Sequence, residues 1–245
     1  MKKSIFGMLL TLESLFIASV ALVAFYYHCS QGEEDWMAFA LTAGITFLCG
    51  MLLTAYGHTD LGRSQKQLSR GGSFIIVGLT WVVFSVFGML PFILYKGLDV
   101  DVASAYFETM SGFSTMGATI IPDIEAMPHG ILLWRSLMQW MGGLGIVVFS
   151  FAMLPVRDMK NSTMFIAEMS GLTINRLQPK IGATSRRLLL IYIVLTVVCV
   201  LMFWAGPMEL FDAVCYGLST VATGGFGTHT ASIGYFHSAY VEYVC

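Results

Sequence analysis

The residues of this chain with the clearest potential for chemistry are small and polar, and they interrupt a strongly apolar sequence. Residues 112–119 read GFSTMGAT, and long apolar stretches lie on both sides of them. Glycine, serine and threonine favour helix poorly, and glycine allows backbone angles that bring carbonyl groups close to a ligand. At membrane depth, irregular backbone is tolerated only where protein surrounds it or where it lines a watery path. Carbonyl groups lining such a path can replace the hydration shell of a cation.

A second segment has the same order of residue types. Residues 107–119 read FETMSGFSTMGAT, and residues 211–225 read FDAVCYGLSTVATGG. Each begins with Phe and an acidic residue, which pairs Phe107 with Phe211, 104 residues further along the chain. Each continues to a glycine, a hydrophobic residue, Ser-Thr and further small residues. Large repeated units are common in transport proteins, so two ion-contacting strips are favoured over the alternative, an ordinary re-entrant turn without an ion.

The segment before the first strip is too short to cross a bilayer. Residues 103–113 number 11, and a helix of that length, at about 1.5 Å per residue, covers about half of the hydrocarbon core. We expect it to enter and return on the same side, as a pore helix followed by a filter strip.

One charged pair is expected to hold the first strip in place. Arg135 lies within an apolar stretch, where a charged side chain needs a partner, and Glu108 on the pore helix is the best candidate. Asp123 and Glu125 are alternative partners. A further alternative is that the Arg135 side chain extends to the outer interface.

The elements that position these residues are membrane spans. The mean hydropathy is +0.74 and only 11% of residues are charged, against roughly 25% in soluble domains. The sequence predicts an all-α integral membrane protein, with two N-terminal spans followed by helix–pore loop–helix repeats, one complete and one partial. A sixth apolar stretch begins near Tyr235. The five longer stretches are 4–27, 36–56, 73–95, 130–154 and 188–205.

The basic residues gather on one side of these spans. Eleven of the thirteen lie in segments that alternate with the acidic segments, and the positive-inside rule makes their side, with the N-terminus, cytoplasmic. An acidic outer side would concentrate cations. The six basic residues of 157–187 form either a dock for a cytosolic regulator or only a topology signal. The eleven are Lys2, Lys3, Arg63, Lys66, Arg70, Arg157, Lys160, Arg176, Lys180, Arg186 and Arg187.

Three parts follow from this pattern: residues 1–72 as a two-span extension with a basic loop, 73–156 as the first repeat, and 157–245 as a cytoplasmic loop with the second repeat. Gly142, Gly143 and Gly145 allow close helix packing or form a hinge. The five cysteines have no metal-binding spacing.

Two runs carry a resemblance to a known family. FETMSGFSTMGATIIPDIEAMPHGILLWRSLMQWMGGLGIVV and STVATGGFGTHTASIGYF closely resemble the TrkH/TrkG potassium-uptake proteins, which are related to the KtrB and HKT transporters. The resemblance covers most of the chain, including the two extra N-terminal spans. It implies a K⁺-channel-like architecture in which four repeats in one chain surround a single pore, each with a key filter glycine.

Matching this family residue by residue places the filter strips. The first strip is Ser114 to Gly117 and the second is Ala222 to Gly225. Gly225 is favoured as the second filter glycine because Phe226 follows it, with Gly224 as the alternative. Met116 departs from the usual Thr, but its carbonyl can still coordinate an ion. The expected filter residues are Thr115, Met116, Gly117, Thr223, Gly224 and Gly225, with K⁺ at Thr115, Met116, Thr223 and Gly224.

The resemblance also implies a function and partners. We expect potassium uptake across the bacterial inner membrane, a homodimer, a TrkA-type cytosolic nucleotide-binding partner, no cofactor besides the transported K⁺, and no nucleic acid. The chain holds one complete repeat and part of a second, so it is expected to be an N-terminal half. One alternative is the pore subunit of an oligomeric two-span cation channel, which two non-identical strips disfavour. A membrane enzyme is the other, but no nucleophile–base pair or metal cluster is seen in the spans.

Overall fold

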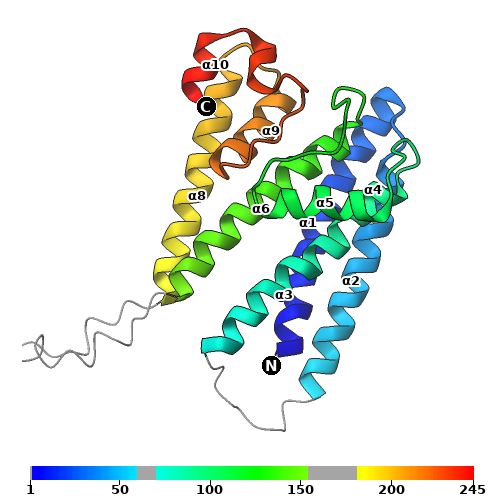
Figure 1. Ribbon diagram of the computed structural model, residues 1–245, viewed down its shortest axis with the longest axis vertical. Helices are drawn as coiled ribbons and strands as arrows, with labels where there is room; N and C mark the ends of the chain where they lie inside the picture. The colour runs from blue at the N-terminus through cyan, green and yellow to red at the C-terminus, as the bar shows by residue number, and fades with distance from the viewer. Residues whose placement is uncertain (1, 60–69, 154–180) are drawn as a thin grey trace, which may run out of the picture.

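The computed structural model describes residues 2–59, 70–153 and 181–245, with side chains for 6–56, 78–145 and 186–245 (Figure 1). These residues form helices and connecting loops, and no strand occurs among them. The long helices are α1 (Lys2–Gln31), α2 (Trp36–Thr59), α3 (Arg70–Gly88), α6 (His129–Met153) and α8 (Ile181–Trp204). The shorter ones are α4 (Leu90–Leu94), α5 (Val102–Phe113), α9 (Leu210–Val221), η4 (Ser232–Phe236) and α10 (Ala239–Val244).

Small residues let α1 and α2 pack closely as a hairpin. Gly7 lies against Thr54, with no room for a Cβ, and a Cβ on Gly50 would stand 2.8 Å from the Thr11 hydroxyl. Both threonine hydroxyls donate to carbonyls of their own helices, at 2.9 Å to Gly7 and 2.8 Å to Gly50. Small residues four apart on both helices are typical of association inside a membrane.

Among the described residues, three helices are long and apolar enough to cross a membrane: Phe6–Gln31, Trp36–Tyr56 and Arg186–Trp204. The apolar stretch predicted over 73–95 is helical through α3 and α4, with a break at Met89 between them. Pro91 has no N–H to continue the helical bonding. The Phe92 N–H donates to the Met89 carbonyl at 3.1 Å, and the Gly88 carbonyl accepts from the Trp134 indole at 3.0 Å. The last helix, α10, also begins later than expected, after η4.

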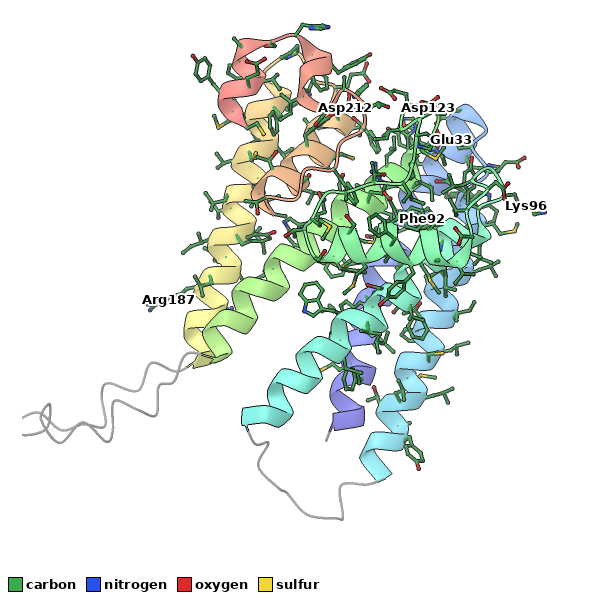
Figure 2. The ribbon with its side chains drawn as sticks, viewed as in Figure 1. Glu33, Phe92, Lys96, Asp123, Arg187 and Asp212 are labelled. Carbon is green, nitrogen blue, oxygen red and sulfur yellow. The ribbon has the colours of Figure 1, made fainter. Side chains whose placement is uncertain are left out.

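The helix ends divide the molecule into two sides. The first residues of α1 lie at the same end as the C-termini of α2 and α6 and the N-termini of α3 and α8 (Figure 1). Arg187 lies at this end, whereas Glu33, Asp123 and Asp212 lie at the opposite end (Figure 2). These labelled acidic residues and Arg187 have the sidedness that the sequence predicts, while Lys96 lies at the acidic end (Figure 2).

The core sits where α1, α5 and α6 meet. Trp134 of α6 is fully buried and packs edge-on against Phe113 of α5, with ring centroids 6.3 Å apart, and against Phe39 of α2 at 6.5 Å. Ile17 and Val20 of α1 are buried in the same cluster. This packing fixes α5, which runs across the long helices (Figure 1).

Candidate ion-selectivity site

The two short helices are structural copies of each other. α5 and α9 each contain 12 residues, and every position in α9 lies 108 residues after its counterpart in α5. Both helices end with the same backbone hydrogen bonds: Ser114 N–H to Met110 O and Ala222 N–H to Leu218 O, then Met116 N–H to Ser111 O and Gly224 N–H to Ser219 O. The repeat is therefore present in the backbone itself.

This register corrects the sequence alignment of the repeat. The sequence paired Phe107 with Phe211, but an interval of 108 residues pairs Phe107 with Cys215 and places Phe211 opposite Ala103. The error arose because Ser219-Thr220 was matched to Ser114-Thr115. Ser219 and Thr220 belong to the last turn of α9, so the two Ser-Thr pairs have different structural positions.

The strips that follow the short helices also share an unusual backbone. Thr115 has φ of 56° and Gly117 of 76°, while Thr223 has φ of 54° and Gly225 of 88°. Positive φ is rare for threonine and is held only where the surroundings impose it. The same two positions in both strips adopt it, so Gly225, and not Gly224, is the counterpart of Gly117.

The two strips contact each other. A Cβ on Gly117 would overlap the carbonyl oxygen of Gly224, so the strips meet at the positions predicted to select the ion. Met116, the counterpart of Gly224, is 68% exposed. The C-terminal ends of α5 and α9, which carry partial negative charge and attract cations, lead directly into the strips.

Glu108 and Arg135 form a buried ion pair behind the first strip. The Arg135 Nε donates to Glu108 Oε1 at 2.8 Å, and both side chains are 1% exposed. The same carboxylate accepts hydrogen bonds from the Thr119 hydroxyl at 2.9 Å and from the Ile120 N–H at 2.9 Å. The pair therefore ties α6 to α5 and to the chain just after the first strip.

Arg135 also contacts the chain after the second strip. Its Nη1 donates to the Gly227 carbonyl at 3.3 Å, and its guanidinium carbon stands 4.2 Å from the centre of the Phe226 ring. One side chain thus joins both repeats. Of the alternative partners for Arg135, Glu125 is bonded elsewhere, since it accepts from the Thr230 N–H at 2.9 Å.

Two glycines let α6 pass close to the ends of both short helices. A Cβ on Gly142 would overlap the Phe113 carbonyl at the end of α5, and one on Gly143 would lie 3.1 Å from the Ala222 Cα just after α9. Gly145 has open space by comparison, with Trp81 as its nearest neighbour at 3.7 Å. Close packing accounts for Gly142 and Gly143, the first of the two interpretations.

Glu33, between α1 and α2, caps α6, and Asp35 is buried beside it. Glu33 accepts a hydrogen bond from the His129 backbone N–H at 3.0 Å and pairs with His129 Nδ1 at 2.6 Å. Asp35 is fully buried against Gly130. Burial, with Glu33 nearby, raises the pKa of Asp35 to about 6, although the backbone N–H groups of Gly130 and Ile131 oppose the shift. Negative charge is favourable at a helix N-terminus.

Sequence reasoning missed Gln139 as part of this site. Its side chain is fully buried on α6, one turn after Arg135, and it contacts the second strip. The available signal was a polar amide inside an apolar stretch, which at membrane depth indicates a buried partner. Among the described residues, no group of three or more His, Cys, Asp or Glu side chains could hold a metal ion.

Taken together, the fold and the site define a helical integral membrane protein in which two half-length helices and their irregular strips lie inside a bundle of long helices. Residues 41–245 match the family model of TrkH, described as a cation transport protein. The chain belongs to the TrkH family.

Individual relatives agree with this assignment. The chain is 38% identical over 242 residues to the Trk system potassium uptake protein TrkH of Halomonas elongata, covering 98% of this chain and 48% of the relative. It is 39% identical over 235 residues to the protein of the same name from Escherichia coli strain K12, covering 96% and 47%. The crystal structure of the potassium transporter TrkH from Vibrio parahaemolyticus superposes with a TM-score of 0.78 at 32% identity, over 99% of this chain and 47% of that one.

These matches confirm the predicted family and the all-α integral membrane fold. The chain spans about half the length of the curated relatives it matches. The relatives are transport proteins and not enzymes, in agreement with the sequence-based expectation.

Proposed function

We propose that this chain supplies part of the ion path of a Trk-type system that takes up potassium across the bacterial inner membrane. The observation that carries the proposal is the pair of strips with matching backbone, in contact through Gly117 and Gly224. The names of the relatives, Trk system potassium uptake proteins, indicate the same ion. The transported K⁺ is the only bound ion that the proposal requires.

In this proposal, carbonyl groups of Thr115, Met116 and Gly117, with those of Thr223, Gly224 and Gly225, replace the hydration shell of K⁺. Left-handed backbone at every second position turns successive carbonyl groups toward the same side of the strip, as a lining of carbonyls requires. The acidic end of the molecule gathers cations before they reach the strips. The membrane potential then drives entry, with about 2.3 kcal/mol per charge for each 100 mV.

The same proposal includes orientation and assembly. The end that carries Arg187 and the N-terminus of α1 faces the cytoplasm, because basic residues are retained there. The protein forms a homodimer and associates with a TrkA-type cytosolic subunit that binds nucleotides. Residues 157–187, of which 157–180 lie outside the described residues, are rich in basic side chains and form the contact for that subunit in this proposal.

Complementation tests the function. A chimaera of this chain and the part of the Halomonas elongata relative that follows the match is expressed in a bacterium lacking its own potassium-uptake systems. We expect it to restore growth at low K⁺ and residues 1–245 alone to fail, since the family resemblance implies four strips around one pore. An inserted chimaera that takes up no K⁺ would contradict the proposal. Uptake by residues 1–245 alone would favour the alternative of an oligomeric two-span channel.

A further inference from the structure

The two strips are held in different ways, although their backbones match. Ser111 and Ser219 are counterparts, 108 residues apart in the chain, and both lie in the last turn of a short helix. The Ser111 hydroxyl donates to the carbonyl of Ala118, the residue that directly follows its own strip, at 2.6 Å. The Ser219 hydroxyl instead donates to Gln139 Oε1 of α6, at 2.7 Å.

The same amide oxygen also accepts a hydrogen bond from the residue that directly follows the second strip. The Phe226 N–H donates to Gln139 Oε1 at 3.1 Å, and Phe226 is the counterpart of Ala118. In the first repeat, the serine at the end of the short helix bonds directly to the residue after the strip. In the second repeat, the corresponding serine and the residue after the strip are linked only through the Gln139 oxygen, to which both donate. The second strip therefore depends on a helix that belongs to the first repeat.

The surroundings of Gln139 leave its amide little freedom. The side chain is fully buried, and a Cβ on Gly224 would overlap the amide group. Its Nε2 has no hydrogen-bond partner among the described residues, so the contacts that fix its orientation are those of Oε1. One turn earlier on α6, Arg135 holds the Gly227 carbonyl. Gln139 and Arg135 therefore both hydrogen-bond to residues that directly follow Gly225.

We propose that Gln139 is a positioning residue that sets the second strip for ion selection, acting through one oxygen that accepts from Ser219 and Phe226. The inference rests on the proposed function, because ion selection is the property that the strip is expected to supply. The group required at position 139 is a carbonyl-type acceptor, and the Nε2 donor is dispensable.

The first arm of the test measures the strip without any transport. Hydrogen–deuterium exchange of the 245-residue chain in lipid nanodiscs is compared for the native protein, Gln139→Leu and Gln139→Glu. Gln139→Leu leaves the buried Phe226 N–H without an acceptor, so we expect exchange in a peptide covering 222–230 to rise about tenfold. A peptide covering 114–121 should be unchanged, and Gln139→Glu, which keeps the acceptor, should restore protection.

The second arm measures the ratio of K⁺ to Na⁺ uptake in the chimaera described above. Gln139→Leu should lower this ratio and Gln139→Glu should recover it. Ser219→Ala should add little to Gln139→Leu, because both remove the same link. Ser111→Ala is the matched control, because the bond from Ser111 to Ala118 does not involve Gln139. Its effect on the uptake ratio should therefore add fully to that of Gln139→Leu.

The two arms separate the inference from the function on which it rests. A chimaera without K⁺ uptake would contradict the proposed function, while the exchange arm would still test the position of the strip. An unchanged exchange pattern in Gln139→Leu would overturn the inference. Equal loosening of both strips, or a failure of Gln139→Glu to restore protection, would also overturn it by showing a general packing role.

Discussion

At the residue scale, the site is a set of buried polar groups that satisfy one another inside an apolar bundle. Arg135 and Glu108 are the clearest case, since each would be costly to bury alone. Their remaining contacts differ. Glu108 also accepts from Thr119 and Ile120, whereas Arg135 has the Gly227 carbonyl and the Phe226 ring. Removal of Glu108 and removal of Arg135 should therefore lower the unfolding free energy by different amounts.

A double-mutant cycle on this pair gives the first prediction. Glu108→Gln should lower the unfolding free energy by about 3–5 kcal/mol, because it leaves the Arg135 charge buried without a counter-ion. Arg135→Gln should cost less, since Glu108 keeps two other donors. The double variant should recover part of the loss. Denaturation in micelles measures all four proteins, and strictly additive costs would show that the two side chains do not interact.

The filter glycines give the second prediction. Gly117→Ser should lower the K⁺ to Na⁺ uptake ratio of the chimaera more than Gly225→Ser does. Both substitutions force a side chain into left-handed backbone, at a cost of about 1–2 kcal/mol, but only the Cβ at Gly117 meets a backbone oxygen, while Gly225 has open space around it. Isotope flux with each ion provides the measurement. The opposite order of the two effects would contradict the geometry.

At the element scale, α6 organises the site. Its N-terminus is capped by the loop between α1 and α2, its middle holds both strips, and its glycines accept the ends of α5 and α9. These contacts join the N-terminal hairpin to both repeats. Substitutions on α6 should therefore affect the structure of more than one repeat.

The packing of α6 gives the third prediction. Gly142→Ala should destabilise the protein strongly, because the new methyl group would overlap the Phe113 carbonyl and push α6 away from α5. Gly145→Ala, on the same helix, is the matched control. It should be neutral or slightly stabilising, since a Cβ there would make only ordinary contact with Trp81, at 3.7 Å, and alanine favours helix over glycine by about 1 kcal/mol. Melting temperatures in detergent compare the two, and equal effects would contradict close packing at Gly142.

The cap on α6 gives the fourth prediction, which concerns pH. Because burial raises the pKa of Asp35 from 3.8 to about 6, the folded protein binds a proton there more tightly than the unfolded chain. The stabilisation of the folded protein by this proton is complete below about pH 4 and is lost as the pH rises through about 6. The free energy of unfolding falls by about 3 kcal/mol over this range. The groups facing Asp35 include Glu33, which pairs with His129.

Substitution of Asp35 isolates its contribution to the pH dependence. Asp35→Asn should raise the melting temperature at pH 7 and flatten its dependence between pH 4.5 and 7. Glu34→Gln, at an exposed neighbouring position, should leave the dependence unchanged. If Asp35→Asn melts with the native pH profile, the buried carboxyl group does not control stability in this range.

At the scale of the whole molecule, the chain has two chemically different ends. Glu33, Asp123 and Asp212 lie at one end and Arg187 at the other, with the apolar helices between them (Figure 2). This separation is what a bilayer requires of a protein whose spans carry few charges. It also places the acidic end where cations would enter.

Cysteine labelling of this topology is the fifth prediction. In a cysteine-free background, Glu34→Cys should react with an impermeant thiol reagent added to intact cells, and Arg187→Cys should react only after the cells are opened. Both positions are exposed, and Glu33, the neighbour of Glu34 in the chain, lies at the opposite end from Arg187 (Figure 2). Labelling of Arg187→Cys from outside would reverse the proposed orientation.

The sequence by itself determined the helical membrane fold, the sidedness of the charges and the existence of two strips. These properties depend on local composition: apolar runs of about 20 residues span a bilayer, and shorter runs followed by glycine do not. The pairing of Arg135 with Glu108 was also accessible, because few buried partners exist for a charge in an apolar helix.

Only the tertiary structure decided the register of the two short helices and the residues that hold the second strip. Ser114-Thr115 directly follows α5, whereas Ser219-Thr220 lies within α9. The local sequence therefore could not distinguish a strip residue from a helix residue. Gln139 meets Ser219 across 80 residues of chain, and Glu33 meets His129 across 96. Such contacts depend on how closely helices approach, which is set by side-chain volume on several elements at once and leaves no periodic signal in any one of them.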